Sequence, residues 1–140
     1  MHQILSDLQL RRLLDNGRRQ QDANNTGEKC RMVPQAYLHL PRSPSSSWLL
    51  ASIDPGDHYM AFGLMTIAGA PPELGYVRLS ELATLRGYRE QGVSHDPLFD
   101  DARELDILEY AEMAKLEGQI VLVFDEKVDP DEIKRELGWE

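Results

Sequence analysis

The chain has 140 residues, the length of one ordinary domain, and its hydrophobic fraction of 41% is sufficient for one core. Its 15 Lys and Arg residues against 24 Asp and Glu residues give a net charge of −9, which argues against general affinity for nucleic-acid backbones. No apolar run approaches the roughly 20 residues of a membrane span. The N-terminus lacks the basic-then-apolar order of a signal peptide. The single cysteine, Cys30, excludes an intrachain disulfide, so we expect one soluble cytoplasmic domain over residues 1–140.

The first elements are read from capping and turn residues. Ser6 and Gln9 match a capping box, and a leucine stripe ending before Gly17 predicts a helix over about 7–16. Residues 17–31 have no periodicity and many turn formers, which predicts a mobile loop.

Four strands follow in the interpretation of the sequence. Alternating apolar residues predict a strand over 34–40, and the Pro and Ser residues of 41–47 predict a turn. The apolar runs 48–53 and 60–67 have strand length and predict a hairpin. Residues 74–79 predict another strand. Ser80 is then expected to cap a short helix whose Leu82 and Leu85 face inward.

The last third predicts two helices and a strand. After an irregular segment over 88–101, Asp100 or Asp101 is expected to cap a helix over about 102–117 that ends at Gly118. Residues 119–124 are typical of a buried strand, and a final helix is expected between Asp129 and Gly138. Consecutive strands joined by turns indicate an α+β domain with a mainly antiparallel sheet of four to five strands and helices packed on it.

Acidic residues are concentrated in this last third. Residues 94–140 hold 15 acidic and 5 basic residues, a net of −10, whereas residues 1–93 are near neutral at +1. The acidic helix predicted over about 102–117 has two interpretations. It is either an ordinary amphipathic helix with a solvated face or a surface that imitates a nucleic-acid backbone and covers a basic groove of another protein. Trp139, near the end of the chain, is a candidate docking anchor. The candidate partner-binding residues are Asp100, Asp101, Glu104, Asp106, Glu109, Glu112 and Trp139.

A second group of residues has the composition of a catalytic or metal site. Asp54, Asp57, His58 and Glu73 combine carboxylates with an imidazole, the groups that bind divalent metals or perform acid/base chemistry. The same Asp-Pro-Gly-Asp run is also what a hairpin turn requires. Because no nucleotide-binding or hydrolase motif is present, we expect no cofactor and no resident metal.

The middle of the chain resembles the domain-of-unknown-function 2958 family, small bacterial proteins common on plasmids, conjugative elements and phages. The resemblance covers about residues 4–120 and leaves 121–140 as a strand-helix extension. It rests on Leu13-Leu14, Asn16-Gly17, Trp48-Leu49-Leu50, Asp54-Pro55, Asp57, the run 61–64, the run 72–77, Leu79, Glu81, Leu82, Asp96, Phe99, Tyr110-Ala111, Gly118 and Ile120.

The resemblance implies an accessory or counter-defence role and no settled activity. Where members of the family tend to carry charged or polar residues, this chain has Tyr37, Ser52, Thr66 and Ser94-His95. These departures argue against an inherited active site.

Three functions therefore stay open. The first is a non-enzymatic acidic protein of a mobile element or phage that inhibits a host nucleic-acid-handling defence complex, of the CRISPR or restriction type, by covering its basic surface. The second is a small metal-assisted hydrolase that uses Asp54, Asp57, His58 and Glu73. The third is a scaffold or regulatory domain that pairs through an exposed strand edge or through the helix ending at Trp139.

Overall fold

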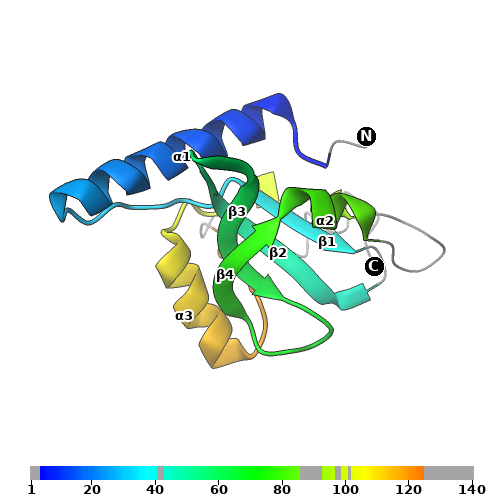
Figure 1. The fold of residues 1–140 in the computed structure, drawn as a ribbon. Helices are drawn as coiled ribbons and strands as arrows, with labels where there is room; N and C mark the ends of the chain where they lie inside the picture. Colours follow the sequence, from blue (N-terminus) through cyan, green and yellow to red (C-terminus); the bar gives the residue numbers. More distant parts are fainter. Residues whose placement is uncertain (1–3, 41–42, 86–92, 97–98, 101, 125–140) are drawn as a thin grey trace.

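A computed structural model describes residues 4–40, 43–85, 93–96, 99–100 and 102–124. Within these ranges the chain forms a five-stranded antiparallel sheet with three helices, which confirms the α+β class (Figure 1). Asp101, the helix predicted between Asp129 and Gly138, and Trp139 lie outside the described residues.

The first helix, α1 (Asp7–Thr26), is twice as long as the sequence predicts. Its capping box is confirmed, because Ser6 Oγ accepts from the Gln9 N–H and Gln9 Oε1 accepts from the Ser6 N–H. The predicted loop over 17–31 is wrong for its first ten residues, since the helix continues through Gly17. It ends at Gly27, where the left-handed φ of 76° favours glycine.

The sheet contains β1 (Ala36–Leu40), β2 (Ser43–Asp54), β3 (Asp57–Thr66), β4 (Glu73–Arg78) and β5 (Ser94–His95) in the order β4-β3-β2-β1-β5. The predicted β2–β3 hairpin is confirmed, with Asp54 opposite Asp57. The predicted turn over 41–47 is wrong for residues 43–47, which belong to β2. Ser47 lies opposite His39 of β1, so pairing with that strand extends β2 toward its start.

The short helix α2 (Leu79–Thr84) begins one residue before the predicted cap. Arg78 occupies the N-cap position without a side-chain hydrogen bond, and Ser80 is already helical. Leu82 faces inward as predicted and is 1% exposed, but Leu85 lies beyond the helix and is 37% exposed.

The third helix, α3 (Ile107–Glu117), is shorter than the predicted helix over 102–117. It begins at Ile107 because Asp106, rather than Asp100 or Asp101, is the cap, and its Oδ1 accepts from the Leu108 N–H at 2.8 Å. Gly118 ends α3 as predicted.

The predicted strand over 119–124 is wrong. In this stretch the structure shows one isolated bridge, between Ala102 and Phe124, and Ile120 packs into the core without joining the sheet.

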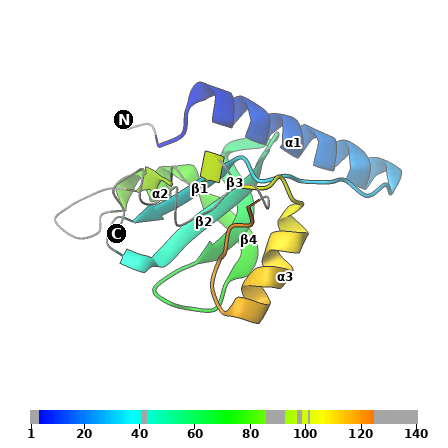
Figure 2. The same ribbon diagram turned by 180° about the vertical axis from the view of Figure 1, so that it is seen from behind.

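Two apolar clusters lie on the two faces of the sheet. On one face, Leu13 of α1 and Leu82 of α2 pack with Trp48, Leu50 and Ile53 of β2. On the other face, α3 packs through Tyr110 and Ala114 against Leu49 and Leu64, among others. Figure 1 and the reverse view in Figure 2 show α2 and α3 on either side of the strands, with α1 running along one end.

Candidate functional site

Asp106 is a structural residue of the α3 region rather than a free surface carboxylate. Its Oδ1 caps α3, and its Oδ2 accepts from the Met32 N–H at 3.0 Å. The Ile107 N–H donates to the Met32 carbonyl at 2.7 Å. Both carboxylate oxygens of Asp106 are therefore used in joining α3 to the segment that follows α1.

The outer face of α3 consists of Leu108, Glu109, Glu112, Lys115 and Leu116, all of which are exposed. At 100° per residue these side chains fall on one arc of the helix, opposite the arc that holds Ile107, Tyr110 and Ala114. Leu108 is 59% exposed and Leu116 is 86% exposed. Two large apolar side chains on either side of Glu112 are unusual on a face that only meets solvent.

Glu104 is exposed and precedes α3 in the chain. Arg31 donates to the Glu104 main-chain carbonyl at 2.7 Å, so the carboxylate itself is not used in that contact. We name three exposed carboxylates of this region, Glu104, Glu109 and Glu112, the acidic patch; Glu109 and Glu112 lie on the outer face of α3, whereas Glu104 precedes the helix and lines the cavity described next. Within the described ranges, none of these three carboxylates lies within 4.0 Å of a basic nitrogen.

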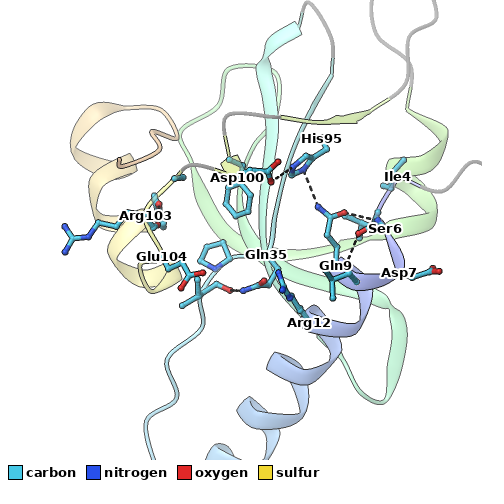
Figure 3. Close-up of a pocket in the computed structure, with 17 residues that line it drawn as sticks. Ile4, Ser6, Asp7, Gln9, Arg12, Gln35, His95, Asp100, Arg103 and Glu104 are labelled. Carbon is cyan, nitrogen blue, oxygen red and sulfur yellow. Dashed lines mark hydrogen bonds and ion pairs between the residues drawn. The ribbon is translucent and has the colours of Figure 1, made fainter. Parts of the chain in front are cut away.

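Asp100 faces a cavity away from the outer face of α3. The cavity has a volume of about 780 Å³ and is bordered by the first turn of α1, by β5 and by residues 99–100 and 102–104. Figure 3 shows His95 between Asp100 and Gln9, with Arg12 and Gln35 on the opposite wall. His95 Nε2 lies 3.5 Å from Asp100 Oδ1, and His95 Nδ1 lies 3.4 Å from Gln9 Nε2.

The capping box assigns the proton positions on His95. Gln9 Oε1 accepts from the Ser6 N–H, so the amide nitrogen of Gln9 faces the imidazole. An N–H donor at that position pairs with an unprotonated Nδ1, which leaves Nε2–H to donate to Asp100. In this arrangement each ring nitrogen of His95 has one side-chain partner, Gln9 or Asp100.

Of the predicted catalytic residues, Asp54, Asp57 and His58 stay together at the β2–β3 turn, and Glu73 lies apart from them. Asp54 Oδ1 accepts from the Gly56 N–H at 2.8 Å, the local bond expected of a turn aspartate. Asp57 accepts from the Tyr59 N–H at 3.1 Å and lies 3.6 Å from Arg78, which is paired with Met60 at one end of β4.

Glu73 lies at the other end of β4, five residues from Arg78 and therefore about 16 Å away along the strand. His58 is exposed on β3. No group of three or more His, Cys, Asp or Glu side chains able to hold a metal ion occurs among the residues that the structure describes.

A second groove, of about 470 Å³, lies between the second half of α1, the β2–β3 turn and the start of α3. Tyr76 of β4 and Phe62 of β3 form one wall, with ring centroids 5.1 Å apart, and Leu108 lines the groove as well. Tyr76 is 67% exposed.

Two features of these sites were missed in the sequence. Leu108 has the spacing of an apolar helix position, but it lies on the exposed outer face of α3. Tyr76 lies in a predicted strand, but alternation alone does not show that β4 is an edge strand that leaves this side chain exposed.

The fold and these surfaces define an α+β protein with an antiparallel sheet and an acidic helix on one face of it. The sequence model of a family described as "Protein of unknown function (DUF2958)" matches residues 4–121, and the chain belongs to this family. No curated protein and no solved structure matches the chain. No helix of the described residues is long and apolar enough to cross a membrane.

Proposed function

We propose that this protein is a non-enzymatic binding protein of a mobile element or phage that inhibits a host nucleic-acid-handling defence complex by covering a basic surface of it. The acidic patch, Glu104, Glu109 and Glu112, is the observation that carries the proposal. Its carboxylates are exposed and available to a partner, whereas Asp106 beside them is used internally.

The charge of the chain supports a basic protein partner. Residues 94–140 hold the whole net negative charge, and the acidic patch lies within this stretch. Complementary charge speeds the encounter of two proteins and disfavours partners of like charge, including nucleic acid itself. Small bacterial proteins of mobile elements, which the resemblance implies, meet host defence complexes whose nucleic-acid channels are basic.

The leucines on the outer face of α3 indicate that the partner surface also has apolar side chains. Leu108 and Leu116 flank Glu112 and are more than half exposed. A partner that covers these leucines needs apolar side chains among its basic residues. A protein surface provides such side chains, and a phosphate backbone does not. Binding should therefore keep a component that salt does not screen.

The local bonds of Asp54 and Asp57 and the distance of Glu73 from them favour a binding function over a hydrolytic one. Asp54 and Asp57 already make local turn bonds, and Glu73 lies at the opposite end of its strand. We expect Asp57→Ala to leave the inhibitory activity unchanged and to act only on the hairpin.

The test is a titration of the purified partner subunit with matched charge variants. The triple variant Glu104→Lys, Glu109→Lys and Glu112→Lys should weaken binding about 10- to 100-fold at low salt, and the difference should shrink as salt rises.

The matched control variant makes the same change in net charge elsewhere on the exposed surface, with Asp22→Lys, Glu28→Lys and Glu81→Lys. It should retain most of the affinity. Equal affinity of the two triple variants, or loss of affinity that does not depend on salt, would overturn the proposal.

A further inference from the structure

The strand β4 forms an open edge of the sheet. It pairs with β3 from Met60 opposite Arg78 to Met65 opposite Glu73 without a shift in register, and no second strand of the described residues pairs with it. Proteins protect such edges with charged side chains, proline or a bulge. Residues 73–78 contain no proline and no bulge and carry charged side chains only at the two ends, Glu73 and Arg78, so the middle of β4 presents a regular row of backbone groups to another strand.

The edge also exposes an apolar side chain. Tyr76 is 67% exposed although its ring packs at a tilt on Phe62. Leu74 lies on the same face of β4 and is partly buried on the α3 side of the sheet. A strand added to β4 would cover Tyr76 and extend this face.

We propose that β4 pairs with β4 of a second copy of this chain, antiparallel, around a two-fold axis at Gly75. Such an axis is perpendicular to the sheet and keeps the corresponding faces of the two copies on the same side. Each residue of one copy then pairs with a residue of the other copy whose number differs from its own by an even number. The register centred on Gly75 places Leu74 of each copy opposite Tyr76 of the other, which gives two apolar pairs. The alternative centred on Tyr76 would pair Tyr76 with itself and place Leu74 opposite Arg78, which gives one apolar pair of this face instead of two.

The local charge of the edge is compatible with a second copy. Its ends carry Glu73 and Arg78, and Asp57 lies 3.6 Å from Arg78, so no single sign dominates. Glu109 and Glu112 of the acidic patch lie on a different element, α3, and two copies meeting there would repel each other. Self-association is therefore favoured at β4, where it produces one continuous sheet of ten strands. The inference does not rest on the proposed function.

Gly75 allows a direct test of the axis. A Cβ added at Gly75 would meet only Met65 Cε, at 3.8 Å, whereas a Cβ at Gly63 on the adjacent strand would lie 2.1 Å from the Leu49 carbonyl oxygen. Position 75 therefore accepts a side chain. Opposite residues of antiparallel strands have Cα atoms about 4.5–5.5 Å apart, a separation that a disulfide spans.

The experiment uses the full chain with Cys30→Ser, and compares Gly75→Cys with Tyr59→Cys under mild oxidation. Tyr59 is a matched exposed position, 58% exposed on β3 and away from the edge. We expect sedimentation to show that the unmodified chain shifts toward the mass of two copies as concentration rises. We expect Gly75→Cys to cross-link at least about tenfold faster than Tyr59→Cys, because only position 75 meets itself at the axis.

A pair of lysine substitutions completes the test. Tyr76→Lys should weaken dimerisation about tenfold, since it removes both symmetry-related apolar pairs, and Tyr59→Lys should leave it unchanged. Circular dichroism confirms that each variant is folded. A chain that stays monomeric at every concentration, or a dimer whose Gly75→Cys variant cross-links no faster than Tyr59→Cys, overturns the proposal.

Discussion

Gly17 offers a sharp test of how α1 is seated on the sheet. A Cβ added at this position would lie 1.8 Å from the carbonyl oxygen of Ile53 in β2. Because Cβ atoms in proteins are essentially never found within 3.0 Å of such a neighbour, Gly17→Ala would force α1 and β2 apart by about 1.2 Å.

The same movement would break the bonds made by the residue beside it. Asn16 Nδ2 donates to the carbonyls of Ala51, at 2.9 Å, and Val33, at 3.1 Å. A displacement of this size stretches both beyond hydrogen-bond distance. Overpacking costs about 1–3 kcal/mol and each unsatisfied buried group about 1–3 kcal/mol, while the better helix propensity of alanine returns about 1 kcal/mol. With the Asn16 side-chain amide as the unsatisfied group, we expect the free energy of unfolding to fall by about 1–5 kcal/mol.

The assay is urea and thermal unfolding followed by circular dichroism. Gly17→Ala should lower Tm by roughly 10 °C, given about 3–5 °C per kcal/mol for a chain of this length. Gly75→Ala is the control, because its added Cβ meets only Met65 Cε, at 3.8 Å, and its free energy of unfolding should stay within about 1 kcal/mol of the original. An unchanged or raised stability of Gly17→Ala would refute the close packing of α1 on β2.

Two further predictions concern the cap of α3 and the buried tyrosines. Asp106→Ala should lower the free energy of unfolding by about 2 kcal/mol in urea, because it removes the acceptor of two backbone N–H groups, whereas Glu109→Ala should change it by less than about 0.5 kcal/mol. Equal effects would contradict the cap. Burial raises the pKa of Tyr37 and of Tyr110 above 10.0, so the folded state holds these protons more tightly than the unfolded state. The contribution of the two tyrosines to stability is complete below pH 10 and is lost as the pH rises above it. In urea titrations, the free energy of unfolding should fall less above pH 10 for Tyr37→Phe than for the unchanged chain.

Strands β1 to β4 were predictable because their signals are local, whereas β5 (Ser94–His95) lies in the stretch 88–101 that the sequence indicates as irregular. Two apolar runs and the Pro55-Gly56 turn between them indicate the β2–β3 hairpin, and the capping box determines where α1 begins. Each signal lies within a few residues of the element that it defines, and tertiary packing agrees with it.

The end of α1 was not predictable from the same kind of signal. A glycine such as Gly17 is typical of a helix end, but here it lies inside α1 because β2 approaches the helix too closely for a side chain. The sequence does not reveal this close approach. The stretch 119–124 has the composition of a strand, yet it makes only one isolated bridge and forms no strand of the sheet. Its Ile120 instead packs into the core beside α3.

The acidic residues divide into two classes that composition cannot separate. Glu109 and Glu112 lie on the exposed face of α3, while Asp106 carries the same charge and is used by two backbone N–H groups. Asp54 and Asp57 follow the turn interpretation, since both accept local backbone bonds. Only the position of each carboxylate relative to backbone donors distinguishes a surface charge from a structural one.

The most direct test of the proposed function is a parallel capture from a bacterial lysate that contains restriction and CRISPR complexes, quantified by mass spectrometry. The baits are the unchanged chain, the Glu104/Glu109/Glu112→Lys variant and the Asp22/Glu28/Glu81→Lys control. We predict that the unchanged chain and the control retain one stoichiometric nucleic-acid-binding subunit, and that the variant of the acidic patch loses it. Equal recovery of the same subunit by all three baits, or recovery of none by the unchanged chain, would contradict the account.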